Sequence, residues 1–102
     1  MANLREYERF DVTLPVVILH GGREFPGQTK NVSLGGMLID GPIEVPFGAE
    51  VKVRVTLPAA KAPSEITATV RWIRDGAIGV QFGSLRAKET WALNQLMKDV
   101  NK

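Results

Sequence analysis

The chain has 102 residues, of which 44% are hydrophobic and 24% are charged. These proportions are typical of one soluble globular domain and exclude disorder for the bulk of the chain. The net charge is only +2 and acidic residues are interleaved with basic ones, so no basic stripe for non-specific nucleic-acid binding is present. Cysteine is absent, which excludes disulfides, thiolate metal sites and thiol catalysis. No membrane-length apolar run and no signal-peptide pattern is present, so we expect a cytoplasmic protein.

The first eleven residues are polar and charged and predict a mobile N-terminal arm, followed by a single domain over 12–102. From Val12 to Ile18 alternate residues are apolar, which predicts a strand, and Gly21-Gly22 then marks a turn. Similar short apolar stretches recur along the chain and predict six or seven strands. The expected ranges are 12–20, 28–32, 37–39, 51–57, 66–72 and 78–82.

Two of these strands form the clearest hairpin. Asp75-Gly76 separates two β-like stretches, which is a strong short-range hairpin signal. Trp72 has the same parity as Val70 in the first of them, so its side chain belongs either to the core or to a surface.

The C-terminal segment changes to a helical period. Leu93, Leu96, Met97 and Val100 form an apolar stripe, so we expect one helix over about 84–100, with Ser84 as its N-cap. Trp91 lies off this stripe, where it either packs on a second surface or is exposed. The fold class is all-β with one C-terminal helix. We favour an antiparallel barrel over a sandwich, because so short a chain has few ways to cover two open sheet edges.

Catalysis finds little support in the residues. His20 is the only histidine, it is in phase with a buried strand face, and the carboxylates are scattered singly. No metal-ligand spacing is present. We therefore expect a binding protein without a metal or cofactor, and not an enzyme.

Two short motifs combine groups that bind anions and bases. Arg5 and Arg9 are four residues apart, and a guanidinium can grip phosphate or the O6 and N7 atoms of guanine. Asn31, Ser33 and Gly36 lie between two predicted strands, and in an extended segment the first two side chains share one side. Taken singly, each motif has a plainer interpretation: a solvated charged arm, or a serine turn whose glycines serve the bend.

Together and in this order, the motifs resemble the ligand signature of the PilZ domain family, RxxxR followed by D/N-x-S-x-x-G. The hairpin over 70–82 and the final helix also resemble this family, so that the resemblance covers about residues 4–97. It implies a six-stranded antiparallel β-barrel with a C-terminal helix, and binding of the bacterial second messenger cyclic di-GMP.

The resemblance also implies roles for particular residues. Arg5 and Arg9 would clamp the guanines and phosphates, while Asn31 and Ser33 hold the ligand from the barrel and Gly36 permits their turn. Asn31 stands where many members carry Asp, and an amide lacks the charge that a carboxylate offers to guanine. Two further residues complete the expected site: Leu4, in place of an arginine that engages a second nucleotide, and Trp72, as a wall beside a guanine.

The expected mechanism is a switch, in which the arm orders on the barrel and an unidentified effector protein senses the change. We expect no DNA or RNA partner and no membrane insertion. The main alternative is a PilZ-like interaction module that binds no nucleotide. An oligonucleotide-binding barrel would need a basic, aromatic face, and aromatics make up only 7% of the chain.

Overall fold

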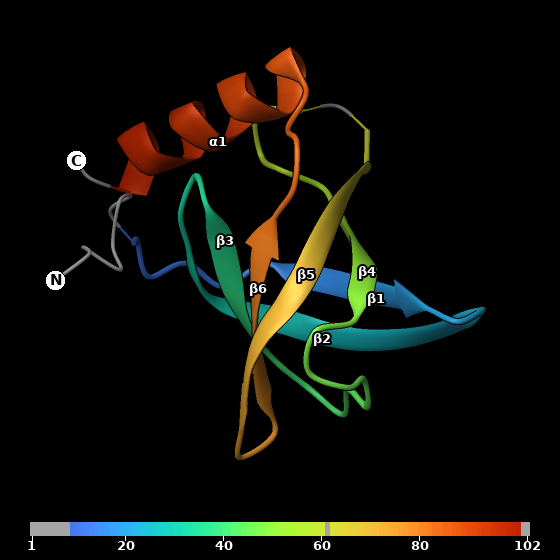
Figure 1. Ribbon diagram of the computed structural model, residues 1–102. Coiled ribbons are helices and arrows are strands. Elements are labelled where there is room, and N and C mark those ends of the chain that lie inside the picture. The colour runs from blue at the N-terminus through green and yellow to red at the C-terminus, as the bar shows by residue number, and fades with distance from the viewer. Residues whose placement is uncertain (1–8, 61, 101–102) are drawn as a thin grey trace, which may run out of the picture.

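Six antiparallel strands close into a barrel in a computed structural model that describes residues 9–60 and 62–100. The strand order around the barrel is β1-β2-β3-β6-β5-β4, so β1 and β4 complete the closure (Figure 1). This confirms the predicted fold class. The elements are β1 (Pro15–His20), β2 (Arg23–Val32), β3 (Gly36–Asp40), β4 (Glu50–Val55), β5 (Ser64–Arg74), β6 (Ala77–Phe82) and α1 (Ala87–Val100).

Both predicted glycine turns connect hairpins. Gly21 and Gly22 have φ angles of 57° and 78°, and Asp75 and Gly76 have 50° and 80°. Two consecutive positive φ angles match the twist of the flanking strands, which is why glycine and aspartate are favoured here. The first turn leads directly into β2 at Arg23, so β2 begins well before the predicted 28. Its early residues are mostly exposed, and this weakened the alternating signal.

The barrel interior is filled by branched aliphatic side chains, which alternate with exposed residues along each strand. The strand parity predicted for β4 is confirmed. Its inward residues Val51, Val53 and Val55 are buried. Fully buried residues from all six strands complete the core, among them Ile18, Val32, Met37, Ile39, Val53, Ile66, Val70 and Ile78.

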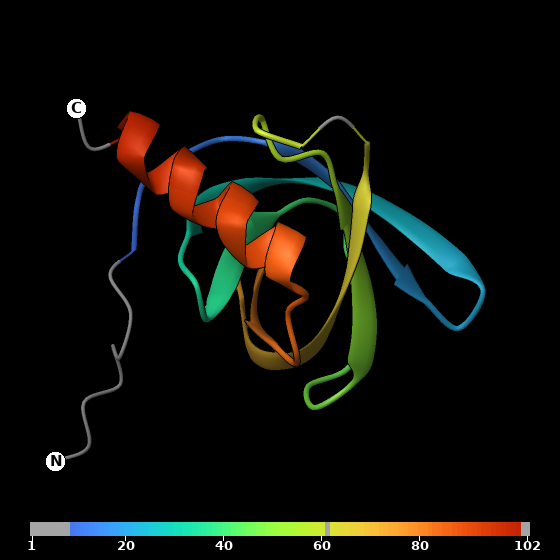
Figure 2. The ribbon, with the colours of Figure 1, turned by 90° about the horizontal axis from the view of Figure 1, so that it is seen from above.

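Helix α1 lies across one end of the barrel (Figures 1 and 2). Leu93 and Leu96 of this helix are buried. Trp91 is 55% exposed, so of the two alternatives for this residue the exposed position is correct. The helix begins at Ala87 rather than near Ser84. The Glu89 carboxylate accepts a hydrogen bond from the Arg86 backbone N–H at 3.0 Å, and this half of a capping box fixes the later start. Among the described residues, no helix has the length and apolar character needed to cross a membrane.

Candidate ligand-binding face

The chain that leads into the barrel is fastened to β2 by its backbone. Phe10 and Val32 form an antiparallel bridge with two hydrogen bonds of 2.9 Å. The hydroxyl of Thr29 donates to the carbonyl of Val12 at 2.6 Å and accepts from the N–H of Leu14 at 2.8 Å. Thr29 is buried, so these bonds are partly shielded from water. We call this arrangement the Thr29 clasp. Residues 1–8 of the predicted arm, including Leu4 and Arg5, lie outside the described residues, and its last part lies along β2.

The Phe10–Val32 bridge brings the two predicted motifs together. Arg9 precedes Phe10 and Asn31 precedes Val32, and the guanidinium Nη1 of Arg9 donates to Oδ1 of Asn31 at 2.8 Å. The two residues are far apart in the sequence, so this contact is a product of the fold.

A β-bulge turns Asn31 toward the outside of the barrel. Thr29 pairs with the buried Ile39, and Asn31 pairs with Leu38, so Lys30 is the extra residue on β2. Without the bulge, Thr29 and Asn31 would face the same side of the strand. Thr29 instead points inward to the clasp, and Asn31 is half-buried on the outer surface.

Ser33 and the residues after it form a tight turn between β2 and β3. The Ser33 hydroxyl accepts hydrogen bonds from the N–H groups of Gly35 and Gly36 at 3.0 and 3.1 Å. The side chain is only 3% exposed. The structure thus gives Ser33 the turn role that the sequence left open as the plainer interpretation. Its predicted contact with a ligand stays a prediction. The hydroxyl can keep both accepted bonds and donate to a ligand if its hydrogen leaves the Gly36 carbonyl, which it contacts at 3.4 Å.

Gly36 is required by strand packing. A Cβ atom at this position would lie 2.1 Å from the carbonyl oxygen of Val80 on β6. Neither Gly35 nor Gly36 is among the residues with positive φ. Gly36 therefore serves the close approach of β3 to β6 and does not provide a left-handed turn residue.

Four residues form a row across the outer surface of neighbouring strands. Asn31 on β2 is opposite Leu38 on β3, Leu38 is opposite Gly79 on β6, and Gly79 is opposite Trp72 on β5. With strands about 4.8 Å apart, Asn31 and Trp72 stand at the two ends of a row about 14 Å long. Gly79 has no side chain, which leaves room for the side chain of its neighbour Trp72.

Trp72 faces outward because β5 also has a bulge. Val70 pairs with Val80 and Trp72 with Gly79, which leaves Arg71 as the extra residue and reverses the parity. Trp72 is 39% exposed, so the interpretation of Trp72 as a core residue is wrong. Its side chain covers Gly79, where an added Cβ would lie 3.2 Å from the Trp72 Cβ.

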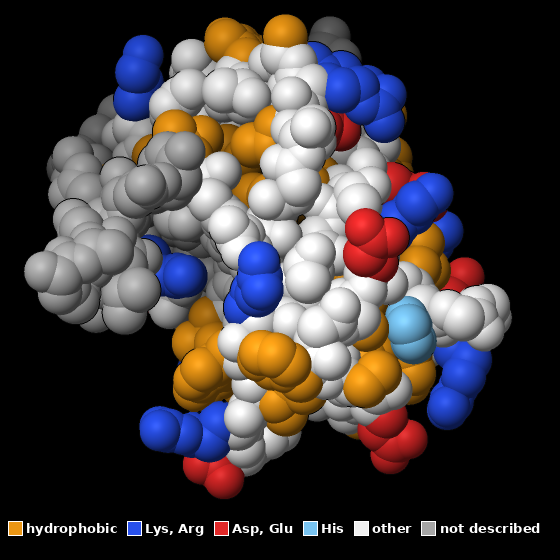
Figure 3. Space-filling model, in the orientation of Figure 1, with side chains coloured by type: hydrophobic (Ala, Val, Ile, Leu, Met, Phe, Trp, Pro, Cys, Tyr) orange, Lys and Arg blue, Asp and Glu red, His pale blue; other side chains and the backbone are white. Residues whose placement is uncertain are grey.

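Basic side chains that sequence reasoning did not single out surround this row. The guanidinium of Arg74 lies 5.5 Å from the centre of the Trp72 ring, a cation–π contact. Arg71 donates to Gln81 at 2.9 Å, and Lys30 lies 3.5 Å from Asp40. Figure 3 shows separate basic side chains over the face formed by β3, β6 and β5. Lys30 and Arg71 are the extra residues of the two bulges, and no sequence pattern predicted the bulges.

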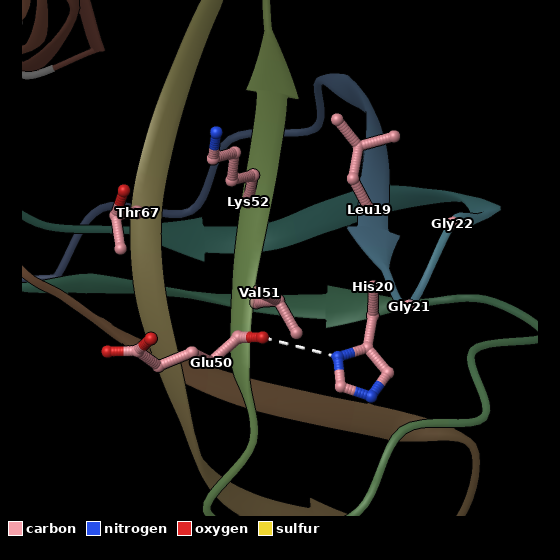
Figure 4. Close-up of a pocket in the computed structure, with 8 residues that line it drawn as sticks. All are labelled: Leu19, His20, Gly21, Gly22, Glu50, Val51, Lys52 and Thr67. Atoms are coloured by element: carbon pink, nitrogen blue, oxygen red, sulfur yellow. Dashed lines mark hydrogen bonds between the residues drawn. The ribbon is translucent and has the colours of Figure 1, made fainter.

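His20 lies at the end of β1, beside the Gly21-Gly22 turn, and its ring bonds to the neighbouring strand β4. Its ring Nδ1 donates to the carbonyl of Glu50 at 3.2 Å, beside a shallow hollow of about 290 Å³ (Figure 4). Within the part of the chain that the structure describes, no three metal-ligating side chains converge.

Comparisons with known proteins agree with this architecture. The family model described as PilZ domain matches residues 3–99, and the chain therefore belongs to the PilZ domain family. A search of curated proteins found no match.

Three solved structures have the same fold. The inhibitor of motility MotI/DgrA of Bacillus subtilis is 23% identical with a TM-score of 0.77, over 98% of this chain and 53% of that one. This chain thus spans about half the length of MotI/DgrA. The PilZ domain of CeSA from a cellulose-synthesizing bacterium is 17% identical, with a TM-score of 0.71 over 93% and 99%. The PilZ domain of YcgR from Escherichia coli, solved with c-di-GMP, is 15% identical, with a TM-score of 0.77 over 97% and 92%.

Proposed function

We propose that this chain is a cyclic di-GMP receptor that passes the signal to a partner protein. The observation that carries the proposal is the Arg9–Asn31 hydrogen bond, which joins the two halves of the PilZ ligand signature on one outer face. Family membership supports it, as does the c-di-GMP in the YcgR structure.

The ligand is held between the arm and the barrel. Arg5 and Arg9 grip guanine edges and phosphates from the arm side, since guanidinium groups bind both chemistries. Asn31 contacts a guanine from the barrel side, Ser33 a guanine or phosphate, and Gly36 lets β3 and β6 approach closely enough to keep the turn in place.

Trp72 forms a wall for the other part of the ligand. It lies three strands away from Asn31, which is too far for both residues to contact one base. A flat ring with a cation beside it attracts purines by stacking. Leu4 covers apolar surface beside a base and occupies space that a second nucleotide would need.

The signal is passed on through a change in the surface that the arm and the barrel present together. Ligand binding fixes the arm on the barrel, and the new surface is recognised by an effector protein. In this proposal the chain is a cytoplasmic binding module, not an enzyme, and cyclic di-GMP is its ligand in place of any cofactor.

The test is calorimetric titration of the purified protein with cyclic di-GMP, with cyclic di-AMP and GTP as controls. Adenine presents a donor where guanine has O6, so cyclic di-AMP should bind about 100-fold more weakly. Comparable affinity for both dinucleotides would contradict the proposal. Absence of all binding would favour the alternative, a PilZ-like interaction module without a nucleotide.

Single substitutions test the clamp. Arg5→Ala and Arg9→Ala should each weaken cyclic di-GMP binding about 10- to 150-fold, because each removes a charge-assisted contact. Arg54→Ala is the matched control, since Arg54 lies on β4, outside the row, and pairs with Glu65. Normal binding by either clamp variant would show that its arginine does not hold the ligand.

A further inference from the structure

One side of helix α1 faces away from the barrel and is exposed along the helix. Leu93 and Leu96 are buried, and with about 100° of rotation per residue the opposite side of the helix is that of Trp91 and Lys98. The exposed positions there repeat at helical spacing, and Lys88 is exposed beside them. We call this surface the outer face of α1, and its residues are Ala87, Lys88, Trp91, Asn94 and Lys98.

The outer face of α1 is basic. It has two lysines and no carboxylate, and Arg86, which directly precedes the helix, has a side chain that is 71% exposed. Glu89 is 2% exposed and belongs to the buried side, where it caps the helix. In Figure 3, hydrophobic side chains over α1 lie between basic side chains on either side. This face therefore attracts an anionic partner.

Trp91 follows Lys88 and precedes Lys98 on this face, and it is 55% exposed. An indole has a large apolar body and one N–H donor, so it is most stable where apolar and wet surroundings meet, as at the headgroup level of a membrane. A lysine beside it can lay its stem along apolar surface and keep its ammonium near a phosphate. At protein interfaces, by contrast, lysine is depleted. A tryptophan flanked by lysines therefore fits a lipid surface better than a protein surface.

The position of α1 makes its outer face accessible to a flat surface. The helix lies across one end of the barrel, so this face is at an extremity of the molecule (Figures 1 and 2). We propose that the outer face of α1 rests on an anionic lipid surface, with Trp91 among the headgroups and Lys88 and Lys98 beside their phosphates. The contact is peripheral, with the helix lying in the plane of the surface. Because the apolar side of α1 stays buried against the barrel, charge and one ring supply the attraction, which falls as salt is added.

Vesicles of phosphatidylglycerol and phosphatidylcholine in equal parts are the probe, and vesicles of phosphatidylcholine alone are the control. A Trp72→Phe variant leaves Trp91 as the remaining one of two tryptophans, and its emission should shift to the blue with the anionic vesicles only. Each cation near an anionic surface raises partitioning about 5-fold, so Arg86, Lys88 and Lys98 together should favour the anionic vesicles about 100-fold. An equal shift with both kinds of vesicle would overturn the inference. So would the absence of any shift, which would leave an acidic protein surface as the partner of this face.

Variants of the outer face, measured by co-sedimentation with the anionic vesicles, provide the second arm of the experiment. Lys88→Gln and Lys98→Gln should each lower partitioning about 5-fold and weaken its salt dependence. Trp91→Ala should lower partitioning about 10-fold and leave the salt dependence unchanged. Lys52→Gln removes the same charge from an exposed position on β4 and should bind as the wild-type protein does. If the two α1 lysine variants partition like the wild-type protein, or no more weakly than Lys52→Gln, the inference fails. No nucleotide is present, so this outcome is independent of the proposed function.

Discussion

Gly36 has no room for a side chain, and this gives a sharp prediction for stability. An added Cβ would lie 2.1 Å from the Val80 carbonyl oxygen, so Gly36→Ala must push β3 away from β6. We expect the free energy of unfolding to fall by about 1–3 kcal/mol, the usual effect of overpacking, measured by urea denaturation. Gly83→Ala is the control, because its Cβ would make an ordinary 3.4 Å contact with the Thr67 carbonyl oxygen. Equal stability of the two variants would contradict this account.

Trp72 offers a spectroscopic prediction. The protein has two tryptophans, and of these Trp72 lies on the candidate ligand-binding face. In a Trp91→Phe variant, cyclic di-GMP should change the remaining fluorescence, because in the proposed site a guanine stacks beside Trp72. In a Trp72→Phe variant, the remaining emission of Trp91 should stay constant. A ligand response from Trp91 alone would remove Trp72 from the site.

At the scale of single residues, the sequence indicated which side chains could contact a ligand better than it indicated which face of the barrel each of them occupies. The spacing of Asn31 and Ser33 suggested two side chains on one side, yet Asn31 is at the surface while Ser33 is buried in its turn. Trp72 showed the parity of a core residue, but the bulge at Arg71 reverses it. A bulge depends on pairing with another strand, so a single strand's pattern does not reveal it.

At the scale of elements, the Thr29 clasp links the predicted arm to the barrel. Replacing Thr29 by Val removes the hydroxyl and leaves the Val12 carbonyl and the Leu14 N–H without its hydrogen bonds. Stability should fall by about 1–3 kcal/mol, the typical cost of unsatisfied buried polar groups. Amide hydrogen exchange should also rise over 10–14.

Thr29→Ser serves as the matched variant because it keeps the hydroxyl. It should retain the slow exchange over 10–14, whereas the valine variant loses it. If the valine variant exchanged as slowly as the wild-type protein, the Phe10–Val32 bridge alone would be sufficient to hold the segment.

Elements that depend on local signals were predictable. Both hairpin turns followed from their glycines, and the C-terminal helix followed from its apolar stripe. The start of β2 was missed because Arg23 and Glu24 are exposed there and carry no strand signal. The start of α1 was missed because Glu89 caps the helix from inside its first turn.

At the scale of the whole molecule, the predicted binding stoichiometry is one nucleotide per chain. Leu4 has no donor with which to hold a second guanine, and in the proposed site its side chain covers apolar surface beside the first. Calorimetry should give a ratio of one for the wild-type protein, and Leu4→Arg should raise the ratio toward two. A wild-type ratio of two would show that Leu4 does not exclude the second nucleotide.

The closure of the barrel has a consequence for how the protein folds. The strands that complete it, β1 and β4, are separated in the chain by β2, β3 and a long connection, and Val16 pairs with Val55. The entropy lost in bringing such distant segments together precedes the contacts that compensate for it. The hairpins β1–β2 and β5–β6 form between neighbouring residues and need no such search. The pairing of β3 with β6 is equally distant in the sequence, since Gly36 pairs with Gln81. We therefore expect the β1–β4 and β3–β6 seams to form after the hairpins, and a newly made chain needs β6 before its barrel can close.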